Sequence, residues 1–431
     1  MNPLAIALIV FAVLMFLGMP IVFVMTFSSL VYCVAVGKIA LLMVVIEKMF
    51  RGMDSFVLLA IPMFIMCGEV MNRGGITTAI VRFADLLVGR VRGGLAYVNT
   101  LASTFFAGIT GSALSDIASL GSILIPAMEE QGYTKDFSCA VTAATAIQGP
   151  LIPPSIPAVL VASATGLSTG ALFWGGAMPG LLIGLGSAIV IFIESRFVEM
   201  PKRTEKIPFR TAIQVTVQSI LPLMTVVIIL VGMNSGVFTP TEAAAVALAY
   251  ALCITTFLYK HIPLSECLVI CKNVLIQTAT IYLIIAGATT FSYVLAIENI
   301  PAKLSALIGT FASSSLGVLV VINIILLVWG MFMDTAPSIL VLVPILFPVA
   351  KAAGVNPIHF GVLVVSNLMI GMLTPPFGMA IYTTQSVGKC KMGNLIRQLI
   401  PFIAVDLVIL VLLTVFPGLS LFLPRLFGFV S

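Results

Sequence analysis

Long stretches without charged side chains alternate with short polar connections along this chain. Residues 137–193, 211–241 and 304–333 contain no Asp, Glu, Lys or Arg. Because a membrane-spanning helix needs about 20 apolar residues, the first stretch is long enough to cross a bilayer, break, turn and cross again. Residues 3–35 form a further apolar stretch, which a glycine and a proline interrupt near its middle. It predicts either one strongly tilted helix or two short helices.

One polar linker, residues 194–213, separates two groups of apolar stretches. It carries five Lys and Arg side chains against three glutamates. Loops with an excess of basic side chains stay on the cytoplasmic side of a membrane, so this linker is predicted to be cytoplasmic. A chain of 431 residues with this pattern has room for roughly eleven or twelve spans of about 20 residues.

The linker divides two halves that repeat the same backbone signals. At a constant offset of 222 positions, residues 123–179 align with residues 345–401 without gaps. Gly and Pro fix backbone shape in ways that other residues do not, so their coincidence indicates an internal repeat. The matching pairs are Pro126 and Pro348, Gly132 and Gly354, Gly149 and Gly371, Pro153 and Pro375, Pro154 and Pro376, Gly166 and Gly388, and Pro179 and Pro401.

Basic side chains predict opposite orientations for the two repeats. Residues 73–92 carry four arginines, whereas their counterparts at 295–314 carry a single lysine. Conversely, residues 389–397 carry three basic side chains and their counterparts at 167–175 carry none. Equivalent loops are therefore expected on opposite sides of the membrane, which is an inverted-topology repeat.

Each half contains a tandem proline inside an apolar segment, four residues after a glycine. The first motif is Gly149-Pro-Leu-Ile-Pro-Pro and the second is Gly371-Met-Leu-Thr-Pro-Pro. Tandem prolines remove two amide donors and clash with the preceding helical turn, so a helix must unwind there. Unwound carbonyls within a membrane are tolerated only where they are buried or line a cavity. Two broken helices at matching positions therefore predict binding sites.

A polar turn precedes each break, between apolar runs that are each too short to span a membrane alone. Residues 108–116 and 331–338 supply these turns, and each contains one carboxylate and at least two hydroxyl groups. The pattern predicts two re-entrant hairpins whose tips lie near the middle of the membrane. Asp116 and Asp334 are candidate helix N-caps, and a carboxylate inside a membrane also indicates a functional site, so both roles stay open.

Oxygen-rich tips that meet unwound carbonyls favour a hard cation such as Na⁺. We expect one Na⁺ site in each half and, beside the breaks, polar side chains that line a substrate cavity. The candidate Na⁺ ligands are Ser112, Ser115, Asp116, Gly149 and Ile152 in the first half, and Asp334, Thr335, Ser338, Gly371 and Thr374 in the second. The candidate substrate contacts are Ser155, Thr165, Asn367, Thr383 and Thr384.

Composition supports a membrane protein and excludes several other classes. Sixty per cent of the residues are apolar and 9% are charged, whereas soluble proteins carry about 25% charged residues. The net charge of +5 is spread along the chain and gives no indication of nucleic-acid binding. Two histidines and seven cysteines provide no convincing zinc set, and no nucleotide-binding glycine loop occurs. We therefore expect neither an enzyme nor an ATPase.

Two further segments complete a resemblance to a known family. Residues 236–245 read Gly-Val-Phe-Thr-Pro-Thr-Glu-Ala-Ala-Ala, and residues 121–126 read Gly-Ser-Ile-Leu-Ile-Pro. With the paired tips and both breaks, they resemble the large membrane subunit of tripartite ATP-independent periplasmic (TRAP) transporters over essentially the whole chain. Gln148, before the first break, is larger than the residues common there in that family.

The resemblance implies a multi-pass protein of the bacterial inner membrane that takes up an organic acid together with Na⁺. The acid would be a C4-dicarboxylate, sialic acid or another sugar acid. Besides the lipid bilayer, the implied partners are a small membrane subunit of about four helices and a periplasmic substrate-binding protein. The implied mechanism is an elevator, in which a transport domain moves against a scaffold.

The resemblance also divides the chain into parts. They are residues 1–99 and 214–313 for the scaffold and arm helices, residues 194–213 for the linker, and residues 100–193 and 314–431 for the transport domain, with hairpins at about 100–130 and 316–352 and broken helices at about 137–165 and 357–388.

The main alternative is a stand-alone Na⁺/carboxylate symporter of the wider ion-transporter superfamily. Such a protein would share the hairpins and broken helices, but it would need neither a binding protein nor a small subunit. Residues 236–245 favour the TRAP assignment. An intramembrane aspartyl protease fits less well, because Asp116 and Asp334 lie in hydroxyl-rich tips beside tandem-proline breaks, which suit ion sites better. A channel also fits less well, because twin inverted hairpins favour alternating access.

Overall fold

The computed structural model describes residues 2–37, 40–202, 208–259, 262–311 and 314–430. Within these ranges the chain forms helices, turns and bends and no strand, which confirms the predicted all-α fold. The helices are α1 (Pro3–Phe16), α2 (Ile21–Val36), α3 (Ala40–Met53), η1 (Phe56–Leu59), α4 (Ala60–Arg73), α5 (Ile76–Val88), α6 (Gly94–Thr110), α7 (Ala113–Glu130), α8 (Lys135–Ala146), α9 (Ile156–Thr165), α10 (Thr169–Phe197), α11 (Phe209–Asn234), α12 (Pro240–Leu258), α13 (Leu264–Ile297), α14 (Ile300–Phe311), α15 (Ser315–Gly330), α16 (Thr335–Ala352), α17 (Pro357–Met372), α18 (Met379–Gly388), α19 (Met392–Val415) and α20 (Gly418–Leu426).

The helices repeat with the same offset of 222 residues as the Gly and Pro matches. α7 begins at Ala113 and ends at Glu130, and α16 begins at Thr335 and ends at Ala352, the same two positions one repeat later. In the same order, α6 matches α15, α8 matches α17, α9 matches α18 and α10 matches α19. Each half therefore contains a hairpin, a broken helix and a following long helix.

The two copies run in opposite directions. α10 packs against its counterpart α19 and against α20, which follows α19. Gly175, near the start of α10, lies beside Ser420 of α20, whereas Gly186, further along α10, lies beside Val405 of α19. The residue number rises from Val405 to Ser420 along α19 and α20 while it falls from Gly186 to Gly175 along α10. The segment of α19 and α20 therefore runs antiparallel to α10. Antiparallel packing of equivalent helices agrees with an inverted repeat.

The N-terminal apolar stretch forms two short helices, α1 and α2. Gly18, between them, has a φ of +74°, a left-handed conformation that glycine adopts without steric cost. Pro20 then directly precedes the first residue of α2. The structure thus selects the second of the two possibilities that the sequence left open.

The halves differ where α13, a helix of 34 residues, occupies the place of both α3 and α4. In the first half, α3 ends just before Asp54 and Ser55. Their side chains favour local hydrogen bonds to the backbone over a continuing helix. The corresponding residues 276–277 are Ile and Gln, which carry no such preference. One half is therefore bent where the other is continuous.

Seven helices of the described residues are long and apolar enough to cross a membrane. Further apolar segments form helices of 10–17 residues, including α9, α15 and α17. The apolar residues from which roughly eleven or twelve spans were predicted therefore form helices of two kinds. Part of it makes full-length helices, and part makes shorter helices that end at the hairpin tips and at the breaks.

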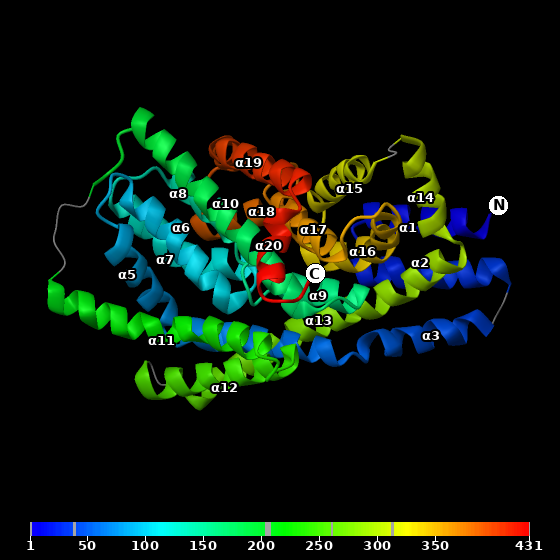
Figure 1. Cartoon of the computed structure of the whole chain (residues 1–431), viewed down its shortest axis with the longest axis horizontal. Coiled ribbons are helices and arrows are strands. Elements are labelled where there is room, and N and C mark those ends of the chain that lie inside the picture. The colour runs from blue at the N-terminus through cyan, green and yellow to red at the C-terminus, as the bar shows by residue number, and fades with distance from the viewer. Residues whose placement is uncertain (1, 38–39, 203–207, 260–261, 312–313, 431) are drawn as a thin grey trace.

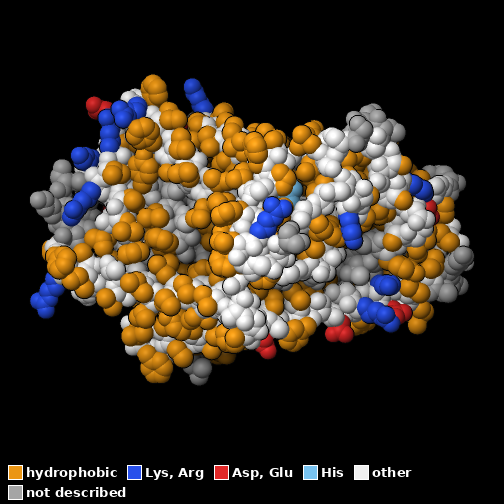
Figure 2. All heavy atoms as spheres, viewed as in Figure 1, with side chains coloured by type: hydrophobic (Ala, Val, Ile, Leu, Met, Phe, Trp, Pro, Cys, Tyr) orange, Lys and Arg blue, Asp and Glu red, His pale blue; other side chains and the backbone are white. Residues whose placement is uncertain are grey.

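The arrangement of the helices suits a lipid environment. α3, α11, α12 and α13 line one long edge of the molecule, and the hairpins and broken helices lie beside them (Figure 1). Hydrophobic side chains cover much of the face in Figure 2, and Lys and Arg side chains lie at its left end, near the 194–213 linker, and also in its centre and at its right. Residues 203–207 of that linker lie outside the described residues.

Candidate functional site

The first tandem proline separates α8 from α9. Residues 147–155 between them form turns and bends, and the peptide bond within the tandem proline is cis. Ser155 ends this segment and caps α9. Its hydroxyl accepts a hydrogen bond from the Ala158 amide (3.1 Å) and donates one to the Pro150 carbonyl. The unwound segment is therefore held in a defined shape at its C-terminal end.

The tip of the first hairpin packs directly against this break. Asp116 is fully buried in the first turn of α7, and its Oδ1 accepts a hydrogen bond from Thr110 Oγ1. Its Oδ2 has no hydrogen-bond partner among the described residues, and a Cβ built on Gly149 would lie 2.5 Å from it. A Cβ built on Gly111 would overlap the carbonyl oxygen of Pro154. The structure thus brings two predicted ligands, Asp116 and Gly149, together.

The other candidate ligands of the first half lie around this contact. Ser112 directly precedes α7 with an extended backbone, and its hydroxyl makes no capping hydrogen bond. Ser112 and Ser115 are both half-buried. The carbonyl groups of Gly149 and Ile152 accept no hydrogen bond from the described residues. Carboxylate, hydroxyl and free carbonyl oxygens of this kind are the ligands that hard cations prefer.

The second hairpin meets its break through a backbone contact. Gly330, at the end of α15, lies against Gly371 of α17, so that a Cβ built on Gly371 would be 2.8 Å from the Gly330 Cα. Thr335, at the start of α16, contacts Met372 with 3.0 Å between Oγ1 and Sδ. Hairpin tip and broken helix therefore touch in both halves.

The carboxylates of the two tips have different local roles. Asp334 is the N-cap of α16, because its Oδ1 accepts a hydrogen bond from the Thr335 amide (2.7 Å). Its carbonyl also accepts the hydroxyl of Ser338 (2.6 Å). Thr374, in the break, donates its hydroxyl to a carbonyl one helical turn earlier (2.8 Å). Asp116, by contrast, lies inside α7 and caps nothing.

The two breaks also differ in exposure. Residues 147–155 are buried apart from one half-buried position, and the first tip is covered by α4, since a Cβ built on Gly68 would lie 3.3 Å from the Thr110 Cα. In the second half, Phe377 of the break is 53% exposed and Phe332 of the tip is 54% exposed. Their ring centroids lie 5.6 Å apart. One site is enclosed, and the other opens at the surface.

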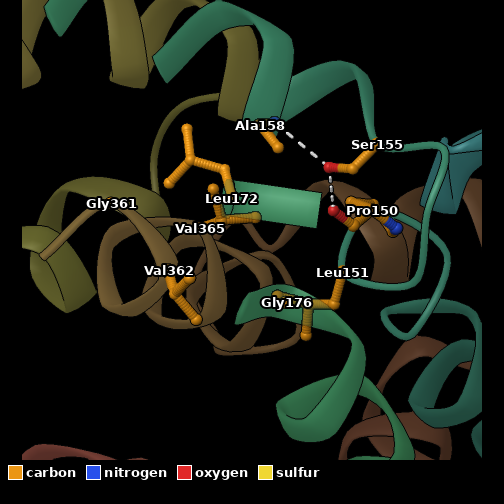
Figure 3. A pocket seen from close by; sticks show the side chains of 9 residues that line it. All are labelled: Pro150, Leu151, Ser155, Ala158, Leu172, Gly176, Gly361, Val362 and Val365. Carbon is orange, nitrogen blue, oxygen red and sulfur yellow. Dashed lines mark hydrogen bonds between the residues drawn. The ribbon is translucent and has the colours of Figure 1, made fainter. Parts of the chain in front are cut away.

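The predicted substrate contacts do not converge on one cavity. Ser155 lines a small cavity between α9, α10 and α17, together with Leu151 and Val362 (Figure 3). Its volume of about 10 Å³ has room for about one water molecule, which is far too little for an organic acid. Thr165 lies at the opposite end of α9, about 15 Å along the helix.

The three predicted contacts of the second half are engaged in hydrogen bonds. Thr383 and Thr384 each donate a hydroxyl to a carbonyl one turn earlier on α18 (2.9 and 2.7 Å). Asn367 is fully buried and donates to the side chain of Asn323 on α15 (2.9 Å). Asn323 in turn donates to Thr414 on α19 (2.8 Å). Asn367 thus joins the broken helix to the hairpin.

Sequence reasoning missed this polar network and its equivalent in the first half. There, Asn99 of α6 donates to Thr142 of α8 (2.7 Å), and Ser103 lies 3.1 Å from Thr145. The available signal was a single amide side chain, Asn99 or Asn323, in a mainly apolar helix. Buried polar side chains need partners, so each amide fastens its hairpin to its broken helix.

A larger cavity joins the halves at the base of the first hairpin. It has a volume of about 510 Å³ and lies where α7, α8 and the end of α18 meet. Glu129, Glu130, Lys135 and Lys389 line it together with apolar side chains. The acidic and basic groups are equal in number, so the cavity has no preference for an anion by charge alone.

Known proteins share both the sequence and the fold. Residues 8–419 match the family described as "Tripartite ATP-independent periplasmic transporter, DctM component". The chain is 39% identical over 417 residues, 96% of each protein, to the sialic acid TRAP transporter large permease protein SiaM of Vibrio cholerae. It is 39% identical over 385 residues, 88% of this chain and 89% of the relative, to the C4-dicarboxylate TRAP transporter large permease protein DctM of Pseudomonas aeruginosa.

A solved structure supports the fold alone. The Alcanivorax borkumensis YdaH transporter superposes with a TM-score of 0.62 over 89% of both chains, at 13% sequence identity. The family match, by contrast, covers nearly the whole chain, and the relatives cover it at similar length. This multi-pass membrane protein therefore belongs to the DctM-component family, the large permease subunits of TRAP transporters.

Proposed function

We propose that this chain performs secondary active, Na⁺-coupled uptake of an organic acid across the bacterial inner membrane. The observation that carries the proposal is the repeated contact between an oxygen-bearing hairpin tip and an unwound break. Asp116 and Gly149 form one such contact, and Thr335 and Met372 mark the other. The relatives named for sialic acid and for C4-dicarboxylates support a carboxylate as the substrate.

We further propose that the acid is delivered by a periplasmic substrate-binding protein and that a small membrane subunit of about four helices completes the complex. The tripartite description of the family supports both partners. In this assembly the permease provides the pathway and the cation sites, while the binding protein selects the acid. The identity of the acid is therefore a property of the binding protein that accompanies this chain.

The sodium requirement provides the test of the cation sites. Asp116→Asn and Asp334→Asn remove one charge each with little change of shape. If these groups hold Na⁺, half-maximal [Na⁺] for uptake is expected to rise roughly fivefold or more, because a charged hydrogen-bonding group is worth about 1–3 kcal/mol. Initial uptake rates measured against [Na⁺] in proteoliposomes that contain the complete transporter give the value.

A matched control is Asp136→Asn, which changes a carboxylate at the start of α8, away from both tips. Its sodium curve should coincide with that of the unchanged protein. If Asp334 acts only as a cap, its replacement costs about 1 kcal/mol or less of stability and leaves the sodium curve unchanged. Unchanged curves for both tip variants would remove the tips from the coupling mechanism.

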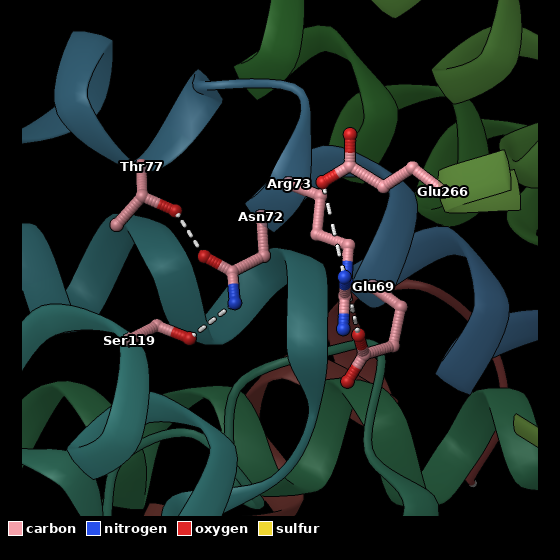
Figure 4. Close-up of polar contacts among 6 residues, drawn as sticks. All are labelled: Glu69, Asn72, Arg73, Thr77, Ser119 and Glu266. Carbon is pink, nitrogen blue, oxygen red and sulfur yellow. Dashed lines mark hydrogen bonds and ion pairs between the residues drawn. The ribbon is translucent and has the colours of Figure 1, made fainter. Parts of the chain in front are cut away.

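An elevator motion of the hairpins against α4 and α5 is the mechanism that we propose for this uptake. Asn72, at the end of α4, donates to Ser119 of α7 (2.6 Å) and accepts from Thr77 of α5 (2.9 Å) (Figure 4). The neighbouring Arg73 pairs with Glu266 of α13 (3.8 Å), so this end of α4 is fixed to the arm helices. Movement of the hairpin would have to break the Asn72–Ser119 bond.

Cross-linking these two positions should therefore stop transport. In a cysteine-free background, Asn72→Cys combined with Ser119→Cys is expected to lose nearly all uptake after treatment with a short bifunctional thiol reagent. The control pair is Ala79→Cys with Ser219→Cys, because Ser219 donates to the Ala79 carbonyl (3.0 Å) within the proposed scaffold. Full uptake by the cross-linked Asn72–Ser119 pair would contradict movement at this interface.

A further inference from the structure

Gln148, the residue before Gly149, carries a polar side chain that belongs to neither group of predicted ligands. It is fully buried and lies in the turn that follows α8. Its Oε1 accepts a hydrogen bond from Thr104 Oγ1 of α6 (2.7 Å), and its Nε2 donates to the Thr145 carbonyl of α8 (3.0 Å). One amide side chain thus fastens the start of the first break to the first hairpin and to the broken helix.

A third helix, α10, packs against this amide, because Gly184 has no side chain. A Cβ built on Gly184 would lie 2.5 Å from the Oε1 and 3.1 Å from the Cδ of Gln148. The end of a flexible side chain can normally move away from such a contact, but here two hydrogen bonds hold it on α6 and α8. Gly184 therefore leaves the space that the Gln148 side chain occupies, and three helices surround the start of the break.

The fold itself does not require an amide side chain at this position. Ile370, the counterpart of Gln148 one repeat later, is equally buried and cannot form these bonds. Both partners of Gln148 also have other bonds, since the Thr104 hydroxyl lies 2.9 Å from the Thr100 carbonyl and the Thr145 carbonyl accepts a backbone amide. Burial of an amide costs free energy unless it is hydrogen-bonded, so its presence in one half alone indicates a role specific to that half.

The backbone carbonyl of Gln148 shapes the turn that contains Gly149. It accepts the backbone amides of Leu151 and Ile152, both at 3.0 Å. The amide of Ile152 is therefore engaged with Gln148, and the Gly149 carbonyl accepts no hydrogen bond from the described residues. The side chain and the carbonyl of one residue thus link α6 and α8 to the unwound segment.

The second break uses the equivalent amide differently. Thr374, the counterpart of Ile152, donates its backbone amide to the carbonyl of Gly371 (2.9 Å), the counterpart of Gly149. The carbonyl of Ile370 accepts the Thr374 hydroxyl (2.8 Å). The glycine carbonyl is therefore free in the first break and engaged in the second. This difference coincides with the residue before the glycine, which is a fastened amide side chain in the first half and an apolar one in the second.

The free carbonyl belongs to the residue that lies against the first hairpin tip. A Cβ built on Gly149 would lie 2.5 Å from the Oδ2 of Asp116, which itself has no hydrogen-bond partner among the described residues. Carboxylate and carbonyl oxygens are the ligands that hard cations prefer. A segment that already has the binding conformation before the ion arrives loses less conformational entropy on binding. A residue that fixes this segment therefore favours cation binding without contacting the ion.

We propose that Gln148 is the positioning residue of the first cation site. Its side chain, held by α6 and α8, fixes the position of its carbonyl, which keeps the Ile152 amide away from the Gly149 carbonyl. The Gly149 carbonyl therefore stays available to the cation. The inference rests on the proposed Na⁺ coupling and adds a difference between the halves. The first ion enters a segment that is fixed in advance, whereas no such amide side chain holds the second break.

Gln148→Met tests this role, because methionine keeps the length of the side chain but removes both hydrogen bonds. In the complete transporter, half-maximal [Na⁺] for uptake should rise about fivefold, since two buried hydrogen bonds are lost. The rate at saturating [Na⁺] should stay within about twofold of that of the unchanged protein, because the change affects binding of the ion more than turnover. A lower maximal rate with an unchanged half-maximal [Na⁺] would indicate a merely structural role and would overturn the proposal.

Thr104→Val provides a second variant in case Gln148→Met fails to fold. It removes the donor to the Gln148 Oε1 and should raise half-maximal [Na⁺] about threefold, whereas Thr104→Ser keeps the hydroxyl and should retain the unchanged value. Thr100→Val is the matched control, because the Thr100 hydroxyl donates to the Ala96 carbonyl of its own helix (3.1 Å). Coinciding sodium curves for Thr104→Val and Thr100→Val would contradict the role of Gln148.

Thermal unfolding of the purified complex at constant ionic strength separates this inference from the proposed function. An ion that binds only the folded state raises Tm as its concentration rises. At the same [Na⁺], Gln148→Met should show a smaller rise in Tm than the unchanged protein. Equal rises in both would overturn the role of Gln148 and leave the cation sites in place. No rise in the unchanged protein, together with uptake that does not depend on Na⁺, would overturn the proposed coupling and this inference with it.

Discussion

Replacing Gly371 with alanine is expected to lower the initial uptake rate about tenfold or more. The new Cβ would lie 2.8 Å from the Cα and 2.9 Å from the carbonyl carbon of Gly330. Both are backbone atoms, so no side-chain rotation relieves the overlap, and the second hairpin must move away from its broken helix. Overpacking of this kind costs about 1–3 kcal/mol, and about 1.4 kcal/mol corresponds to a tenfold change.

The measurement compares uptake rates in proteoliposomes with equal amounts of assembled transporter. Gly393→Ala is the matched control, because no atom lies within 4 Å of the position of its Cβ and its φ is not in the left-handed region. It should transport like the unchanged protein. Uptake by Gly371→Ala at the unchanged rate, with the same sodium curve, would show that the contact of the second hairpin with its break has no part in transport.

Omission of the substrate-binding protein is expected to abolish uptake at micromolar substrate. The family is tripartite by description, and we propose that this chain receives its acid from a protein that captures it. Proteoliposomes with the permease and the small subunit, but without the binding protein, should therefore retain only background counts. The measurement is the accumulation of labelled acid under an imposed Na⁺ gradient, with and without the purified binding protein.

A control for this experiment is addition of a binding protein from a TRAP system for a different acid, which should restore nothing. Robust accumulation by the permease alone, dependent on Na⁺ and saturable by the acid, would favour the stand-alone symporter over the tripartite system. The same preparation with the small subunit left out identifies the contribution of that partner.

Glycine and proline, which determine the local backbone conformation, account for the part of the structure that the sequence predicts well. The repeat followed from seven Gly and Pro coincidences, and α7 and α16 begin and end at positions that differ by the same offset. Gly and Pro act locally, through allowed φ values and missing amide donors. Helix breaks and hairpin turns can therefore be predicted from Gly and Pro in the sequence without knowing which residues are neighbours in space.

Packing between distant segments accounts for what the sequence does not show. Asn367 is a predicted substrate contact, and only the structure shows that its side chain donates to Asn323, which is 44 residues away and belongs to the hairpin. The repeat offset matches Asp334 with Ser112 and Asp116 with Ser338, so the two carboxylates stand at different positions of their turns. That Asp116 lies against Gly149, however, is visible only in the folded structure. These distinctions depend on which helix covers which, and that is decided by side-chain shapes over the whole molecule.

Asp406, a buried carboxylate in the interior of α19, illustrates a different limit. Its place in an otherwise apolar helix is visible in the sequence, yet a lone carboxylate in such a helix often has a basic partner elsewhere. Its burial and the lack of a hydrogen-bond partner for its Oδ2 among the described residues emerge only in the folded structure. Absence of a neighbour is a property of the fold and leaves no trace in the residue itself.

Of the two broken helices, only the second is accessible to a small-molecule inhibitor at the surface of this permease. The first is sealed beneath α4 and α10, so a compound would have to displace protein to reach it. The second presents the rings of Phe332 and Phe377 at the surface, where a flat aromatic group has two partners for stacking. A molecule that joins such a group to a carboxylate would therefore bind the second half of the repeat in preference to the first. Inhibition by such a molecule would act at the second break alone, because the rings of Phe332 and Phe377 are exposed there.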